Sequence, residues 1–284
     1  MRPDINASDA RRVPIALTIA GSDSGGGAGI QADLKTFSAL GVYGCSVLTA
    51  LTAQNTLGVQ GIHGVEPDFV RQQMDSVLGD LAVDAVKIGM LGTPETVAAV
   101  AAGLRAWNPP RIVLDPVMVA KGGDRLLRDE AVAALRDRLL PLAYLITPNL
   151  PEAGALLDRP PPADRDAMMA AALRLAALGP AHVLLKGGHL GGEVSPDLLL
   201  ADGRAVWLEA ARIDTRHTHG TGCTLSSAIA ALLARGLPLT EAVAAAKRWL
   251  SGAIAAGTGL GVGAGIGPVH HFHALWPLLA DRHG

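Results

Sequence analysis

Short apolar runs alternate with segments of helical spacing along most of this chain. The runs have the length and the flanking glycine, proline or polar residues that are typical of buried strands, and they cover residues 15–20, 45–53, 83–88, 111–114, 142–147 and 182–185. Apolar residues at helical spacing predict helices over 30–40, 68–78, 93–107, 129–140, 149–158 and 164–178, and from about 223, 240 and 268 onward. Strands that alternate with helices pair in parallel through right-handed crossovers, so the pattern predicts an α/β sheet with helices on both faces.

The stretch from Pro196 to Leu208 departs from this alternation. It has Asp202-Gly203 between two short apolar runs, which is a typical sequence for a tight hairpin turn. We therefore expect an antiparallel hairpin at the edge of a mostly parallel sheet. No internal repeat or dividing linker is visible, so we expect a polar tail over residues 1–12 and a single domain over residues 13–284.

Polar residues follow most of the predicted strands. In open α/β sheets, ligands bind at the carboxyl ends of the strands. The residues just beyond these ends, which we expect to meet at one edge of the sheet, are Asp23, Gln54, Met90 (apolar, but similarly placed), Asp115, Asn149, Glu152, Lys186 and the loop around Gly220.

Gly220 and Gly222 lie directly before a long alanine-rich helical run that ends near Arg235. A helix that begins after Gly-x-Gly has unpaired N–H groups aimed at one point, with the positive end of the helix dipole behind them. Glycines also let an anion approach the backbone closely. The stretch predicts a phosphate site, and the alternative is an ordinary loop with a helix cap.

Four further residues suit phosphate and magnesium. Lys186 ends an apolar strand, where a lysine is desolvated unless an anion meets it. Asn149 and Glu152 share the first turn of a predicted helix, Asp115 directly follows a strand, and oxygen ligands of this kind suit Mg²⁺. Spacing alone leaves two alternatives open, a capping box at Asn149 and Glu152 and a simple turn at Asp115.

The composition excludes several classes of protein. The formal net charge is −2, so there is no basic surface for nucleic acid. Cys45 and Cys223 are the only cysteines, and they form neither a disulfide framework nor a cysteine zinc site. Residues 1–12 lack the apolar core of a signal peptide, and no apolar run reaches membrane-spanning length, so we expect a cytoplasmic protein without a membrane partner.

Three other motif matches are weak. Gly27-Ala-Gly29 fits part of a dinucleotide-binding pattern, but the second strand ends at Gln54 without the acidic residue that would bind a ribose. The loop at 21–25 has the outline of a nucleophile elbow with Asp23 where a hydrolase needs serine. His217 and His219 lack a third ligand at zinc-site spacing, so we expect neither NAD, nor acyl transfer, nor a histidine metal site.

Five stretches, residues 18–36, 147–152, 186–189, 218–224 and 267–273, together closely resemble the hydroxymethylpyrimidine/phosphomethylpyrimidine kinases of thiamine biosynthesis. The resemblance implies the ribokinase-like fold, a three-layer αβα sandwich. It also implies an enzyme that uses ATP and Mg²⁺ to phosphorylate 4-amino-5-hydroxymethyl-2-methylpyrimidine and then phosphorylates the monophosphate to the diphosphate. Members of the family form homodimers, so the resemblance implies a homodimer here.

The resemblance also implies roles for individual residues. The pyrimidine pocket would be lined by Gly21, Asp33, Gln54, Met90 and Val117. The ATP would be served by Asn149, Lys186, Thr221 and Lys247, and the magnesium, mostly through water, by Glu152 and Asp115. The catalytic group would consist of Lys186 and an anion hole formed by Gly220, Gly222 and Cys223.

Cys223 stands where most ribokinase-like sugar kinases carry aspartate and where the pyrimidine kinases carry cysteine. Its place at a helix start predicts a lowered thiol pKa. Two other functions stay open at this point. One is a pyridoxal or pyridoxine kinase with the same chemistry. The other is a catalytically silent ligand-binding protein, against which the intact Asn149, Glu152, Lys186 and Cys223 argue.

Overall fold

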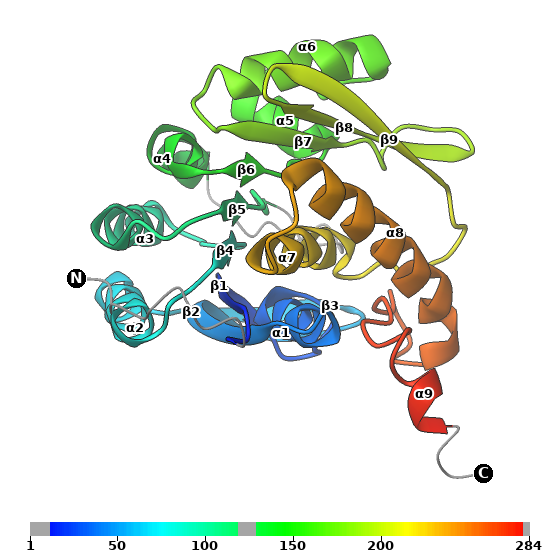
Figure 1. Ribbon diagram of the computed structural model, residues 1–284, viewed down its shortest axis with the longest axis horizontal. Coiled ribbons are helices and arrows are strands. Elements are labelled where there is room, and N and C mark those ends of the chain that lie inside the picture. Colours follow the sequence, from blue (N-terminus) through cyan, green and yellow to red (C-terminus); the bar gives the residue numbers. More distant parts are fainter. Residues whose placement is uncertain (1–11, 119–128, 281–284) are drawn as a thin grey trace.

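The computed structural model describes residues 12–118 and 129–280 of the chain (Figure 1). The predicted polar tail, residues 1–12, therefore lies almost wholly outside the described residues, and the single domain over residues 13–284 stays a prediction. Every strand of the described ranges belongs to one nine-stranded sheet. No helix within these ranges is both long enough and apolar enough to cross a membrane.

The strands are β1 (Ile15–Asp23), β2 (Tyr43–Asn55), β3 (Gly58–Gly64), β4 (Ala85–Ile88), β5 (Ile112–Leu114), β6 (Leu145–Ile146), β7 (His182–Lys186), β8 (Val194–Ala201) and β9 (Arg204–Ala211). The α-helices are α1 (Gly29–Ala39), α2 (Pro67–Asp80), α3 (Pro94–Trp107), α4 (Asp129–Arg138), α5 (Leu150–Leu157), α6 (Arg165–Ala176), α7 (Thr221–Ala234), α8 (Leu239–Gly257) and α9 (Pro277–Ala280). Short 3-10 helices cover Leu140–Leu142 and Thr258–Leu260.

The sheet has the strand order β3-β2-β1-β4-β5-β6-β7-β8-β9. Strands β2, β1, β4, β5, β6 and β7 are parallel, whereas β3, β8 and β9 pair antiparallel with their neighbours. Helices α1, α7 and α8 pack on one face around one apolar core, and α2 to α6 pack on the other around a second core (Figure 1). The predicted three-layer αβα sandwich with an antiparallel edge hairpin is confirmed.

One prediction about the elements is wrong, and one strand was not predicted. β3 contains three glycines and is largely exposed, so it has no apolar alternation to detect. No α-helix begins at Pro268, because Pro268 pairs with His219 and the His270 N–H donates to the Ala253 carbonyl, and these contacts hold the segment against the domain. α8 begins at Leu239 after Pro238, next to the predicted start near residue 240.

Of the three helices on its face of the sheet, α7 has the largest buried share of residues. Every residue from Thr224 to Ala234 is buried, and most of these side chains are small. Small side chains let the helix pack closely against β1, β4 and β5 and against its neighbours α1 and α8. The position of its N-terminus is therefore set by contacts on nearly all sides.

A substitution in the turn between β8 and β9 tests backbone strain at positive φ. Asp202 and Gly203 have φ values of 50° and 72°, and a Cβ added at Gly203 would meet nothing within 4 Å. Gly203→Ala should therefore lower the free energy of unfolding by about 1–2 kcal/mol through backbone strain alone. Urea unfolding measures this loss.

Gly191→Ala is the matched control for that test. A Cβ there also meets nothing within 4 Å, and Gly191 is absent from the residues with positive φ. This variant should be neutral or stabilising by up to about 1 kcal/mol. Equal destabilisation of the two variants would contradict the strained turn.

Candidate active site

Helix α7 begins without a side-chain cap. Its N-cap, Gly220, has φ 78°, and no side chain of the described residues caps the first turn. A side chain at Gly220 would overlap with the carbonyl oxygen of Gly27, so both the positive φ and the close approach require glycine. The Thr221 hydroxyl donates to the Thr218 carbonyl at 2.7 Å. The Thr221 N–H donates to the Thr218 carbonyl at 3.3 Å, so the N–H groups of Gly222 and Cys223 are the ones left for an anion.

Lys186 and Asp115 meet this helix end at the carboxyl edge of the sheet. A Cβ on Gly222 would lie 3.4 Å from Lys186 Nζ and 3.7 Å from Asp115 Oδ2. Lys186 Nζ donates to Asp115 Oδ1 at 2.8 Å, and the Thr147 hydroxyl donates to the same oxygen at 2.9 Å. Lys186 ends β7 and Asp115 directly follows β5. The expected convergence of these residues with the Gly220 loop is observed.

The two charges of this pair support each other. Burial by itself raises the pKa of Asp115, but the charges of Lys186 and Lys87 outweigh burial and hold the pKa below its usual range. Burial lowers the pKa of Lys186, and the charges of Asp115 and Glu152 outweigh it, so the Lys186 pKa is raised. A charged ammonium therefore faces the uncapped helix end at neutral pH.

Asn149 and Glu152 form a capping box at the start of α5. The Glu152 N–H donates to Asn149 Oδ1, and the Asn149 N–H donates to Glu152 Oε2, each at 2.8 Å. The capping alternative left open by the spacing is thus present, and it uses one oxygen of each side chain. Burial raises the pKa of Glu152 to about 7, although the charge of Lys186 lowers it. The Glu152 carboxylate therefore lies within the electrostatic field of the Lys186 and Asp115 pair.

Gly21, Met90 and Gln54 lie around the carboxyl ends of β1, β4 and β2. A Cβ on Gly21 would overlap with the terminal methyl group of Met90. Glycine at position 21 therefore leaves the space that the Met90 side chain occupies. The Thr52 hydroxyl donates to the Ser22 carbonyl at 2.8 Å and lies 3.1 Å from Gln54 Oε1, while Gln54 Nε2 lies 3.5 Å from His219 Nε2. Val117 is half-buried in the segment after β5. Gly21, Met90 and Gln54 thus border the same edge of the sheet as the anion site.

Asp23 holds the glycine loop that follows β1. Its carboxylate accepts from three backbone N–H groups within Gly25–Ala28 at 2.8 to 3.1 Å and pairs with His219 Nε2 at 2.8 Å. His219 directly precedes Gly220, so this pair ties the loop after β1 to the start of α7. Asp23 was expected just beyond a strand end, but its pair with His219 was not predicted. Within residues 12–118 and 129–280, no cluster of three or more His, Cys, Asp or Glu could hold a metal.

Asp33, expected in the pyrimidine pocket, has a carboxylate that is surrounded by protein donors. The side chain is fully buried and accepts from Lys87 Nζ at 2.8 and 2.9 Å. The Thr18 and Ser227 hydroxyl groups also donate to it, at 2.6 and 2.5 Å. Lys87 was missed by the sequence analysis, although a lysine inside the apolar run 85–88 was a visible signal.

Lys247, expected at the nucleotide, already has an acidic partner. Its ammonium donates to Asp197 Oδ2 at 2.6 Å and to the Ser195 carbonyl at 2.8 Å. Asp197 Oδ1 in turn accepts from the Gly187 N–H at 2.9 Å. Through Asp197, Lys247 therefore stabilises the backbone next to Lys186. The carboxylate of Asp197 balances the charge of Lys247.

The Cys223 thiol is not activated in this structure. Burial raises its pKa to about 11, although the charge of Lys87 opposes the shift. The expectation of a lowered pKa is wrong because removal from water outweighs the helix dipole and the lysine. The thiol therefore stays protonated at neutral pH.

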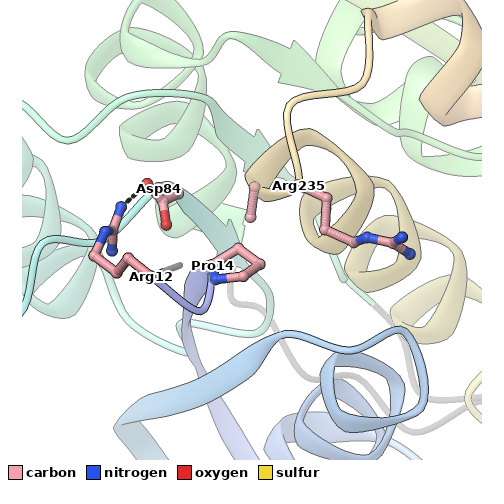
Figure 2. A pocket seen from close by; sticks show the side chains of 5 residues that line it. Arg12, Pro14, Asp84 and Arg235 are labelled. Atoms are coloured by element: carbon pink, nitrogen blue, oxygen red, sulfur yellow. Dashed lines mark hydrogen bonds and ion pairs between the residues drawn. The ribbon is translucent and has the colours of Figure 1, made fainter. Parts of the chain in front are cut away.

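A separate pocket of about 320 Å³ lies at the opposite edge of the sheet (Figure 2). It is lined by Arg12, Pro14, Asp84, Ala234 and Arg235, at the starts of β1 and β4 and the end of α7. Arg12 pairs with Asp84, and Arg235 donates to the carbonyl of the α1 C-cap at 3.2 Å. Both guanidinium groups thus have protein partners, and the site chemistry lies at the carboxyl edge instead.

The central sheet is mostly parallel and is covered by helices on both faces. An uncapped helix, a lysine and two carboxylates lie at its carboxyl edge. Together, this fold and this site define a ribokinase-like phosphotransferase. The chain belongs to the phosphomethylpyrimidine kinase family, whose model matches residues 23–270.

Two relatives show how far the similarity extends. The chain is 57% identical over 261 residues to the hydroxymethylpyrimidine/phosphomethylpyrimidine kinase of Escherichia coli strain K12, covering 92% of this chain and 98% of that protein. It is 55% identical over 269 residues to a thiamine biosynthesis bifunctional protein of Geobacter sulfurreducens, covering 93% of this chain and 54% of that protein. The family similarity therefore spans nearly the whole chain.

Two solved structures share the fold. An ADP complex of Bacillus subtilis pyridoxal kinase has a TM-score of 0.86 and 40% identity, with 93% of this chain and 99% of that chain covered. The phosphomethylpyrimidine kinase of Clostridium difficile has a TM-score of 0.76 and 44% identity, with 86% and 100% covered. A pyridoxal kinase and a phosphomethylpyrimidine kinase thus share this architecture.

His271 predicts a pH dependence of stability. Its Nε2 lies 3.1 Å from the Thr224 hydroxyl, and burial lowers the pKa of His271 to about 3, with Lys35 acting in the same direction. An unfolded histidine titrates near pH 6.5, so the unfolded state binds the proton first as pH falls. The contribution of neutral His271 to the free energy of unfolding is therefore complete above about pH 6.5. It declines by about 1.4 kcal/mol per pH unit as the pH falls to about 3.

Urea unfolding at pH 7.5 and pH 5 checks this dependence. The His271→Gln variant should lose about 2 kcal/mol less than the wild type between these two values, because glutamine does not titrate. Identical losses in the two proteins would mean that His271 is not held neutral by the fold.

Proposed function

We propose that the chain transfers the terminal phosphoryl group of ATP to the hydroxymethyl group of 4-amino-5-hydroxymethyl-2-methylpyrimidine, and then to the resulting monophosphate, in thiamine biosynthesis. Membership of the phosphomethylpyrimidine kinase family and the names of the relatives support this substrate. The observation that carries the chemistry is the meeting of the uncapped α7 N-terminus with Lys186 and Asp115 around Gly222.

Phosphoryl transfer depends on positioning and on neutralising the charge spread over the phosphate oxygens. We assign this neutralisation to the N–H groups at Gly222 and Cys223 and to Lys186 Nζ. A loose transition state needs little proton removal from the attacking hydroxyl, so a protonated Cys223 thiol is compatible with it. We therefore assign Cys223 to the shape of the anion hole rather than to a base.

Mg²⁺ fits the oxygen donors at this edge. Asp115 uses Oδ1 for its protein donors while Oδ2 faces Gly222, and Glu152 uses Oε2 for the capping box. Mg²⁺ commonly takes one or two carboxylates and keeps waters and phosphate oxygens as its other ligands. Asp115 and Glu152 would hold it mostly through water, with Asn149 orienting Glu152. When bound, the ion supplies positive charge to the phosphate oxygens.

We place the pyrimidine beside Gly21, Gln54, Met90 and Val117. A carboxamide pairs both as donor and as acceptor, which suits an aminopyrimidine edge. The Gln54 amide nitrogen lies 3.5 Å from His219 Nε2, so the side chain stands beside the loop that precedes α7. The Met90 side chain, packed against Gly21, supplies an apolar surface for the ring.

The nucleotide assignment rests on fewer contacts. Asn149, Lys186 and Thr221 border the anion site, whereas Lys247 acts through Asp197 on the backbone after Lys186. The ADP complex of the similar pyridoxal kinase supports ATP as the phosphoryl donor. A homodimer and a cytoplasmic location are further proposals that rest on the family resemblance.

Release of ADP with three separate acceptors tests the proposal. The pyrimidine alcohol and its monophosphate should both be phosphorylated, with kcat/KM values above that for pyridoxal. Lys186→Met should lower kcat with both pyrimidines by about a hundredfold or more, because each step brings anionic oxygens together. A preference for pyridoxal would indicate a vitamin B6 kinase, and no ADP release with any acceptor would indicate a silent binding protein.

Glu152→Gln separates a magnesium role from capping. Glutamine can replace glutamate in a capping box, so the melting temperature should change little, whereas the charge of the metal ligand is lost. The Mg²⁺ concentration for half-maximal rate should rise about tenfold, equivalent to ~1.4 kcal/mol.

Thr93→Ala is the control for this experiment. Thr93 caps the distant α3 by accepting from the Thr96 N–H at 3.2 Å, so its loss should cost about 1 kcal/mol of stability without changing the Mg²⁺ requirement. An unchanged Mg²⁺ dependence in Glu152→Gln would leave that residue with capping alone.

A further inference from the structure

A second lysine and aspartate pair lies behind the anion-binding end of α7. Lys87 on β4 and Asp33 on α1 are both fully buried, and Lys87 Nζ lies 2.9 and 2.8 Å from the two carboxylate oxygens. The same carboxylate accepts from the Thr18 hydroxyl on β1 at 2.6 Å and from the Ser227 hydroxyl on α7 at 2.5 Å. Two strands and two helices therefore share one polar network.

Small residues on the sheet make room for this network. The register of β1 and β4 places Thr18 opposite Lys87. A Cβ at Gly89 would lie 2.9 Å from Lys87 Nζ and 3.0 Å from the Cβ of Ala20, so a larger residue would displace the ammonium. The strand ends are thus shaped to hold Lys87 where it meets α1 and α7.

Stability alone does not account for the pair. Moving two charges out of water is so unfavourable that apolar residues of similar volume are often equally or more stabilising. A buried charge without its partner, however, is strongly destabilising, so the pair specifies which groups must lie together. Any shift of α7 that separates Ser227 from Asp33 would leave part of this network unbonded.

Within its buried stretch, two side chains of α7 bond to other elements: Thr224 lies 3.1 Å from His271 Nε2, and Ser227 donates to Asp33 at 2.5 Å. Its buried stretch, Thr224–Ala234, is rich in alanine, and small side chains form shallow ridges against their neighbours. Ser227 lies one turn after Cys223, about 6 Å along the axis from the first N–H groups. A hydrogen bond at Ser227 is therefore close enough to set where those N–H groups lie.

We propose that the Lys87 and Asp33 pair is a positioning element for phosphoryl transfer, which through Ser227 fixes the axial position of α7. It thereby sets the placement of the N–H groups of Gly222 and Cys223 relative to Lys186. The inference rests on the proposed phosphotransferase function. Lys87 and Asp33 are positioning residues, since they act through Ser227 and contact no reacting atom.

Ser227→Ala is the first test, because it removes one hydroxyl and leaves the ion pair intact. We expect kcat to fall about ten- to hundredfold at unchanged KM for ATP and for the alcohol, since a displacement of about 1 Å has an effect of that size. The dissociation constant for ADP with aluminium fluoride, measured without any alcohol, should rise by a similar factor.

Thr36→Val is the matched control on the facing helix α1. Thr36 is also fully buried, and its hydroxyl donates to the Ala32 carbonyl at 2.7 Å, outside the network. This variant also loses one buried hydroxyl bond, so its melting temperature should fall about as far as that of Ser227→Ala. Its kcat and its affinity for ADP with aluminium fluoride should remain those of the wild type.

The double variant Lys87→Met/Asp33→Leu tests the pair itself. It preserves volume and leaves no unpaired charge, so it should fold. The Thr18 and Ser227 hydroxyls lose their acceptor, so its melting temperature should fall about as far as that of Ser227→Ala, with the same kcat loss.

Wild-type kcat and wild-type affinity for ADP with aluminium fluoride in Ser227→Ala or in the folded double variant would overturn the inference. So would a kcat loss in Thr36→Val equal to that in Ser227→Ala. A wild-type enzyme that binds ADP with aluminium fluoride but does not phosphorylate the pyrimidine would defeat the substrate assignment only.

Discussion

The uncapped N-terminus of α7 is the constraint on which the rest of the site depends. In the part of the chain that the structure describes, no side chain caps it and only the Thr221 N–H bonds back to the Thr218 carbonyl, so the N–H groups of Gly222 and Cys223 must meet water or an anion. Gly220 can pack on the Gly27 carbonyl only without a side chain, and Asp23 bonds both the glycine loop and His219. The fold therefore holds the helix end open and presents it to the carboxyl edge of the sheet.

Three lysine and aspartate pairs lie around this end, and they differ in their access to a ligand. Lys87 with Asp33 is sealed from solvent, and Lys247 with Asp197 is also bonded to the Ser195 carbonyl. Lys186 and Lys247 have similarly exposed side chains, 13% and 10%, but of the two Lys186 is the one that lies beside Gly222. An incoming phosphate can therefore compete with Asp115 for Lys186, while the other two pairs keep their partners and hold the surrounding elements.

The chain's pattern predicts the layers well because buried parallel strands must be apolar on both faces, as in 15–20 and 182–185. The Asp202-Gly203 turn is similarly local, since its positive φ values restrict the residues that fit. β3 escaped prediction because its glycines and exposed residues carry no apolar signal. The segment after Pro268 has helical spacing, but its conformation is decided by contacts with His219 and Ala253, which lie far away in sequence.

In the site, too, features set by local sequence or topology could be predicted, and features set by distant contacts could not. Topology alone brings Asp115, Lys186 and Gly222 together, because strand ends and helix starts share one edge. The partners of a buried charge are a tertiary property, so the pairing of Asp33 with Lys87 and of Lys247 with Asp197 could not be predicted from spacing. The direction of the Cys223 pKa depends on burial in the same way.

That neutral thiol has a consequence for a kinase that acts twice. In the second step the attacking group is a phosphate monoester, which carries its own negative charge, and Asp115 already places one carboxylate near Gly222. A carboxylate in place of Cys223 would add a second negative charge close to both phosphates, and like charges at that distance repel strongly in a partly desolvated site. A cysteine whose thiol stays protonated avoids this repulsion and still lets the backbone N–H groups of α7 face the anion. The residue type at this position thus favours an acceptor that is first a neutral alcohol and then an anion.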